Sequence, residues 1–220
     1  MSNIKLIPAS GGGSASLAPP NSTSGADLTF TLPNTAGTGK VNHGNVLEQF
    51  LTPCDGSAIT VPSGTYTVGN VTALQNLSTT YADVTGSSIS YTPPAGTTQV
   101  IYEFRTCLGA KAGGDDWTIP HLRLYLDSDE VVYQRTTVSA RDYHDDQVQF
   151  RYAFNIGGTA NTNTGRVASW SGAKTIKIQA REYNSSGHQA RLHCIYHWDG
   201  GVGDTFHQPS VGITAIGTPT

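Results

Sequence analysis

Apolar and polar residues alternate strictly along several stretches of the second half of the chain. In an extended strand, successive side chains point to opposite faces, so one face of residues 147–156 would be apolar. That face carries Val148, Phe150, Tyr152 and Phe154. Leu122, Leu124 and Leu126 alternate in the same way, as do Ile176 and Ile178. This pattern is typical of half-buried antiparallel strands, because parallel strands covered by helices read as continuous apolar runs.

Strand-like runs recur roughly every 8 to 20 residues, separated by Gly, Pro, Asn and Asp turns. We place them at residues 57–61, 65–75, 79–91, 98–108, 119–127, 130–138, 147–156, 174–183, 189–198 and 206–216. The strands after residue 86 suit two packed sheets. The pattern therefore predicts an all-β fold with an antiparallel β-sandwich (jelly roll) head over residues 87–220.

The first part of the chain has short apolar runs set in Ser, Thr, Gly, Pro and Asn. Such a segment cannot bury a core alone, so residues 1–42 are predicted to form an extended β stem or docking arm. Residues 43–86 are predicted as a short helix and β linker, with the helix at Gly44 to Leu51, because its apolar residues recur at helical spacing. The candidate residues for docking or a trimeric stem are Ile4, Leu6, Leu28, Phe30 and Leu32.

Charged residues make up 13% of the chain, about half the usual share, and Ser, Thr, Asn and Gly supply the polarity instead. This composition favours strands and turns over helices. A formal charge of −3 gives no basic footprint, so we expect no binding to nucleic acid. No run of 18 apolar residues and no signal peptide is present, so we expect neither export by a signal nor membrane insertion.

Motifs for catalysis or metal binding are absent from the sequence, and we expect no cofactor, no metal and no enzyme activity. Glycosidase activity is the alternative left open, because its two carboxylates pair in space and their pairing cannot be read from a sequence. The three cysteines, Cys54, Cys107 and Cys194, lack zinc-site spacing and are predicted to be free thiols, with a disulfide left open. His193 and His197 would lie about 13 Å apart on one strand, too far to share an ion within one chain.

Exposed aromatic and acidic residues in the predicted loops are the candidate contacts with a receptor or partner. They are Asp115, Asp116, Trp117, Tyr143, His144, Trp170 and Trp198. A tryptophan in a turn can stack on a sugar ring or anchor an interface, and burial at a strand end is an equal alternative. The loops where we expect contacts are residues 109–118, 140–146, 157–173, 184–188 and 199–205.

Four stretches resemble a known family. The sequence SGGGSASLAPP at residues 10–20, followed by LTFTLPNTAGT at 28–38, is similar to a segment of tail-fibre and other virion structural proteins of marine bacteriophages. The runs TTYADVTGSSISYTPP at 79–94 and PSVGITAI at 209–216 resemble the C-terminal head of such proteins. The resemblance implies a homotrimer with a jelly-roll head similar to those of tumour-necrosis-factor and complement-C1q type proteins, and it carries no catalytic motif.

The function expected from this resemblance is that of a phage virion structural protein, a short trimeric tail fibre or appendage whose head contacts the host surface. Residues 1–42 would bind other virion proteins, and the host partner would be a cell-surface glycan or protein. The first alternative is a capsid decoration, cement or head-fibre protein, and the second is a carbohydrate-binding module. The expected location is the virion, assembled in the host cytoplasm.

Overall fold

The computed structural model describes residues 4–6, 15–17, 45–110, 117–141, 145–183 and 190–218. The chain divides into two compact units, Met1–Lys40 and Val41–Thr220. In the first unit, β1 (Ile4–Leu6) pairs antiparallel with β2 (Ala15–Leu17). The predicted stem residues Ile4 and Leu6 belong to β1, whereas Leu28, Phe30 and Leu32 lie outside the described residues.

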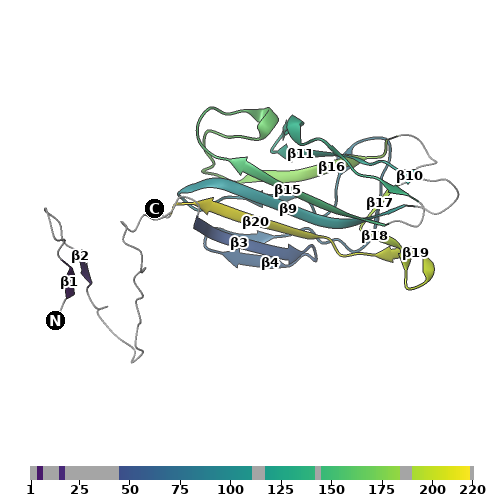
Figure 1. Ribbon diagram of the computed structural model, residues 1–220, viewed down its shortest axis with the longest axis horizontal. Coiled ribbons are helices and arrows are strands. Elements are labelled where there is room, and N and C mark those ends of the chain that lie inside the picture. Colours follow the sequence, from purple (N-terminus) through teal and green to yellow (C-terminus); the bar gives the residue numbers. More distant parts are fainter. Residues whose placement is uncertain are drawn as a thin grey trace, which may run out of the picture. The chain divides into compact units, whose positions relative to one another are not determined.

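The larger sheet of the second unit is built around the long strand β9 (Figure 1). Its strands are β3 (Asn45–Pro53), β20 (Ser210–Gly217), β9 (Thr97–Ala110), β15 (Asp146–Asn155), β17 (Ala190–Leu192) and β6 (Gln75–Asn76). The order is β3-β20-β9-β17-β6, and β15 also pairs with β9. Leu108 is opposite both Asp146 of β15 and Leu192 of β17, so those strands lie on opposite edges of β9.

The second sheet contains β11 and β16, which pair over six residues at the top of the view in Figure 1. Its strands are β12 (Asp129–Glu130), β11 (His121–Leu126), β16 (Lys174–Arg181), β7 (Ala82–Asp83), β13 (Thr136–Thr137) and β8 (Ile89–Tyr91). The pairs named between strands of both sheets are antiparallel.

Short strand pairs and turns complete the unit. They are the pair β4 (Ala58–Val61) with β5 (Gly64–Thr67), the pair β10 (Trp117–Thr118) with β14 (Ala140–Arg141), the pair β18 (Cys194–Trp198) with β19 (Gly201–Phe206), and the 3₁₀ turns η1 (Val132–Gln134) and η2 (Thr162–Thr164). Among the described residues, no helix is long and apolar enough to span a membrane.

The core fills the space between the two sheets. Tyr102, Phe104 and Phe154 come from the larger sheet, and Leu124 and Ile178 come from the second. All five are essentially inaccessible, whereas the intervening residues of each strand are more exposed. The all-β antiparallel sandwich and its alternating strands are therefore confirmed.

The helix predicted at residues 44–51 is wrong, because Asn45–Pro53 is a strand. Glu48 and Phe50 are buried, whereas Gln49 and Leu51 are exposed, which is the alternation of a strand. Pairing with β20 along its whole length outweighs the local helical spacing. The segment 43–86, predicted as a helix and linker, therefore lies in the second unit and contributes strands to its sheets.

Five predicted strands are shorter or interrupted in the structure. The run 65–75 is broken between β5 and β6, and the run 79–91 is divided into β7 and β8. The run 130–138 contains the 3₁₀ turn η1 between β12 and β13. The run 189–198 is divided into β17 and β18 at His193, whose φ of 59° lies in the left-handed region. The run 206–216 starts late, because β20 begins at Ser210. Each interruption turns the chain where apolar patterning alone gives no signal.

Candidate functional site

Four of the five predicted contact loops leave the same end of the sandwich. Ala110, the last residue of β9, is opposite Ala190 at the start of β17. Asp146, the first residue of β15, is opposite Leu108 of β9. The β18–β19 hairpin lies at this end as well, at the right of Figure 1. We call this region the loop end; its described residues are 109–110, 117–118, 140–141, 145–146, 183, 190 and 199–205.

The fifth predicted loop, residues 157–173, lies elsewhere. It follows Asn155 of β15, which is opposite Gln99 near the start of β9. The loop is therefore at the other end of the larger sheet from Ala110. It cannot contribute to one contact surface with the loop end.

A buried carboxylate organises the backbone of the loop end. Glu182 is 2% exposed and accepts three hydrogen bonds from backbone N–H groups. The donors are Ile119 at 3.2 Å, Tyr183 at 3.0 Å and Ala190 at 2.8 Å. These bonds join Ile119, between β10 and β11, to both flanks of the segment 184–189. Charge-assisted bonds of this kind stabilise a fixed backbone geometry at the base of a loop.

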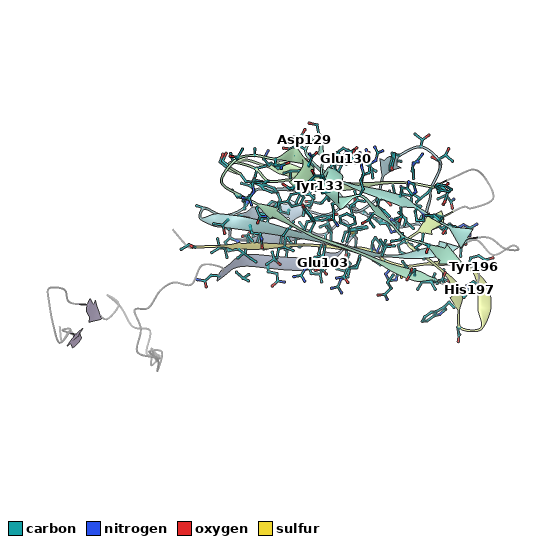
Figure 2. All side chains as sticks on the ribbon, turned by 45° about the horizontal axis from the view of Figure 1, so that its top comes forward. Glu103, Asp129, Glu130, Tyr133, Tyr196 and His197 are labelled. Atoms are coloured by element: carbon teal, nitrogen blue, oxygen red, sulfur yellow. The ribbon has the colours of Figure 1, made fainter. Side chains whose placement is uncertain are left out.

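A second carboxylate joins two strands of the loop end. Asp145 Oδ2 accepts a hydrogen bond of 2.7 Å from the backbone N–H of His197 and lies 3.8 Å from its Nδ1. Asp145 directly precedes β15, and His197 belongs to β18, so the bond connects the larger sheet to the hairpin. Figure 2 labels His197 and its neighbour Tyr196 on this hairpin. This hydrogen bond therefore fixes the position of the hairpin at the loop end.

The tip of the β18–β19 hairpin presents Trp198 to solvent. Trp198 is 63% exposed and pairs with Gly201 across a two-residue turn. Asp199 and Gly200 have φ values of 53° and 75°, as a type I′ turn requires. Phe206, at the end of β19, is also exposed. Phe206 pairs with Cys194 at the base of the hairpin, so the aromatic surface at the tip, able to stack on a partner, is that of Trp198.

The other predicted contact residues have different positions. Trp170 is 6% exposed, and its indole Nε1 donates a hydrogen bond of 3.0 Å to the carbonyl of Tyr91. It is a core residue, so its prediction as an exposed contact is wrong and the buried alternative holds. Trp117 lies on β10, opposite Arg141. The remaining candidates, Asp115, Asp116, Tyr143 and His144, lie outside the described residues.

Beneath the hairpin, His193 forms a buried polar network that sequence reasoning missed. Its Nδ1 is 2.7 Å from Thr106 Oγ1, and its Nε2 is 2.8 Å from Thr85 Oγ1. Thr85 in turn donates to Gln75 Oε1. Burial, with a smaller effect of nearby His207, lowers the pKa of His193 to about 4. The imidazole is therefore neutral at physiological pH and acts as a structural bridge.

A second polar site lies on the outer face of the second sheet. The ring centroid of Tyr81 is 3.7 Å from the guanidinium carbon of Arg123 and 5.2 Å from that of Arg181. Arg135 forms an ion pair of 2.6 Å with Glu130. A pocket of about 170 Å³ adjoins this group. These residues come from separate segments, so the only sequence signal was the placement of long polar residues on one face of β11 and β16.

The described residues form neither a metal site nor a reactive thiol. Among those residues, no group of three or more His, Cys, Asp or Glu is placed to hold a metal ion. Cys54, Cys107 and Cys194 are free and buried. Burial is the main cause that raises the pKa of Cys54 to about 12 and that of Cys194 to about 11. None of them has the exposed, acidified character of a reactive thiol.

Comparison with known proteins does not identify a family for this chain. No family model and no curated protein matches the chain. Solved structures that match include chains from infectious bursal disease virus, one from the Gt strain and one from the VP2 subviral particle. Each match has 11% identity and covers 74% of this chain, with TM-scores of 0.29 and 0.26. This chain spans about half the length of those chains, 47% in both cases, and overlap at this level supports no conclusion on function.

Proposed function

We propose that the protein is a structural component of a bacteriophage virion, a short trimeric tail fibre or appendage whose loop end contacts the host surface. Residues 1–42 would dock onto other virion proteins, and the head would have a binding role and no catalytic one. The observation that carries the proposal is the gathering of four loops and the exposed Trp198 at one end of a rigid sandwich. The sequence resemblance to virion proteins of marine phages supports the same role.

The outer face of the larger sheet is our candidate for the trimer interface. On this face Glu103 of β9 lies 2.6 Å from Arg105 and 3.7 Å from Arg151 of β15. Ile101 lies on the same face, because it alternates with the inward residues Val100 and Tyr102. Figure 2 labels Glu103 on this sheet. A face with the partly exposed apolar residue Ile101 and these ion pairs suits contact with identical copies.

One observation favours the decoration alternative. Among the described strands, only β20 pairs with β3, so the other edge of β3 has no strand partner and is our candidate for strand addition. A pocket of about 310 Å³ adjoins the end of this strand. It is lined by Leu51, Thr52, Pro53, Gln208, Pro209 and Ser210. An extended segment of a coat protein that pairs with β3 would use both features.

Two measurements test these roles. Analytical ultracentrifugation should give three times the 23.2 kDa mass of the chain, and a stable monomer at micromolar concentration would contradict the trimer. Immunogold labelling of intact particles should place the protein on the tail. Signal over the whole capsid would favour decoration instead, and absence from the particle would reject both.

Host contact has its own test with a matched pair of exposed aromatic residues. Purified protein should compete with phage for adsorption, and Trp198→Ser should weaken this competition. Tyr133→Ser removes a comparably exposed ring from η1, away from the loop end, and should leave competition unchanged. Equal effects of both substitutions would contradict a contact through the loop end.

A further inference from the structure

The pocket beside Tyr81 has the composition of a binding site that the proposed function does not use. It is lined by Tyr81, His121, Leu122, Arg135, Thr136 and Thr137, and we call it the Tyr81 pocket. Its walls come from β11, from β13 and η1's C-terminal flank, and from the segment before β7. Figure 2 labels Glu130 and Tyr133, which belong to the neighbouring β12 and η1. A cationic side chain, hydroxyl groups and aromatic rings thus surround one small volume.

Positive charge exceeds negative charge at this site. Arg135 binds Glu130 through Nε at 2.6 Å and Nη2 at 3.3 Å, and Arg123 lies 3.6 Å from the same carboxylate. Arg181 forms no ion pair with any described residue, and its Nη1 donates only a long bond of 3.5 Å to the carbonyl of Thr79. Two guanidinium groups therefore share a single carboxylate partner, and the third has no ion-pair partner among the described residues. The excess of two positive charges favours an anionic ligand.

An unsatisfied donor at the site gives the same indication. The Nε of Arg181 is buried and has no hydrogen-bond partner among the described residues. A buried guanidinium N–H without an acceptor has a desolvation cost, which an oxyanion or an ordered water would relieve. Arg181 is opposite His121, a residue of the pocket wall, in the pairing of β16 with β11. Arg181 does not line the pocket itself, but its guanidinium carbon lies 5.2 Å from the ring of Tyr81, which does.

Aromatic surface at the site suits a sugar ring. Arg123 and Arg181 fix the Tyr81 ring by cation–π contacts of 3.7 and 5.2 Å. The imidazole of His121 packs at 5.6 Å against the ring of Tyr183, which is exposed. A tyrosine or histidine ring offers an apolar face beside a polar edge, and the hydroxyls of the pocket threonines can donate to or accept from sugar hydroxyls.

We propose that the Tyr81 pocket binds an acidic saccharide, with Arg135 and Arg181 holding its sulfate or carboxylate and the aromatic rings contacting the sugar. The guanidinium fork matches both oxyanions, which is why arginine rather than lysine suits this role. An extended polyanion such as nucleic acid is a poorer ligand, because the chain has a formal charge of −3 and no broad basic surface. The inference does not depend on where the protein lies in a particle.

The test is isothermal titration calorimetry of the full chain with four probes: a sulfated galactan oligosaccharide, its desulfated counterpart, an oligomannuronate and sodium sulfate alone. Binding of a sulfated or uronate oligosaccharide, absence of binding by the desulfated one, and weaker binding at higher salt are expected. Arg135→Gln and Arg181→Gln should each raise the dissociation constant roughly tenfold or more, as expected for loss of a charge-assisted hydrogen bond.

Lys174→Gln is the matched control. Like Arg135, Lys174 forms an ion pair with an acidic residue, Asp127 at 2.8 Å, but it is the first residue of β16, whereas Arg181 is the last. This control should bind as the unmodified protein does, and equal unfolding temperatures would show that all three variants are folded. Equal weakening by Lys174→Gln, absence of binding by both acidic oligosaccharides, or equal binding of sulfate alone would overturn the proposal.

The outcome is separable from that of the proposed function. Binding by purified protein that is absent from phage particles would support the saccharide site and reject the virion role. A particle-bound protein that binds no acidic saccharide would do the reverse.

Discussion

Tyr91 donates a hydrogen bond to Glu48 inside the core, which joins β8 of the second sheet to β3 of the larger one. The same carboxylate accepts a bond of 3.0 Å from the backbone N–H of Ser63 and another from its hydroxyl. Burial, followed by the contact with Glu48, raises the pKa of Tyr91 well above its usual value. Donors from two segments therefore stabilise an acidic side chain that would otherwise be costly to bury.

Replacing Tyr91 by Phe should lower the free energy of unfolding by about 1.5–3 kcal/mol, because a buried carboxylate loses one of its donors. Tyr152→Phe is the control, since Tyr152 donates a bond of 2.9 Å to a neutral acceptor, the carbonyl of Thr164. Its expected loss is about 0.5–1.5 kcal/mol. Urea unfolding monitored by fluorescence measures both, and equal losses would contradict a special contribution of the Glu48 contact.

The buried imidazole of His193 should make stability depend on pH. Its pKa is about 4 in the folded protein and about 6.5 when unfolded, so the unfolded state binds more protons between these values. Stability is complete above pH 6.5 and should fall by up to about 3 kcal/mol as the pH drops to 4. The midpoints of urea unfolding, measured at several pH values between 6.5 and 4, test this dependence, with His193→Asn as the comparison.

In the His193→Asn variant the pH slope should flatten, even if its overall stability is lower. The carboxyl groups whose pKa is lowered, such as those of Asp83 and Asp127, lose their contribution only as the pH falls below their usual range near 4. They therefore add little between pH 6.5 and 4.5. An unchanged slope in the variant would assign the dependence to other groups.

Alternation along the sequence was enough to predict the long strands, because burial in a sandwich follows the two-residue period of a strand. The runs at 147–156 and 119–127 correspond closely to β15 and β11. The segment 44–51 was misread because its apolar spacing also fits a helix, and only pairing with β20 decides between them. Local pattern carries no information about such distant partners.

The candidate sites show the same limit. The loop end was predictable in part, because loops on a sandwich follow the strand ends and an Asp-Gly pair beside Trp198 indicates a hairpin turn. Trp170 has no local feature that separates a core indole from an exposed one, and its hydrogen bond to Tyr91 joins residues far apart in sequence. The Tyr81 pocket also combines separate segments, so only the fold brings its arginines together.

All three cysteines should react slowly in the folded protein. Cys54, Cys107 and Cys194 are buried, and burial raises the pKa of each thiol, so the nucleophilic thiolate is scarce. A disulfide-exchange reagent at pH 8 should modify three thiols rapidly in denaturant and none rapidly without it. Rapid native modification of any one thiol would show that its segment opens without global unfolding.

Gly165 should tolerate alanine less well than Gly158 does. Both have positive φ, 62° and 72°, so an added Cβ costs about 1–2 kcal/mol of backbone strain at either position. At Gly165 the new Cβ would also lie 2.8 Å from the ring of buried Phe154, whereas at Gly158 the nearest atom is the flexible end of Arg166 at 3.8 Å. Crowding in the core should add about 1–3 kcal/mol to the loss for Gly165→Ala. Urea unfolding of the two variants measures the difference in the free energy of unfolding. Equal losses would show that the ring of Phe154 moves away from the new Cβ at position 165 without cost.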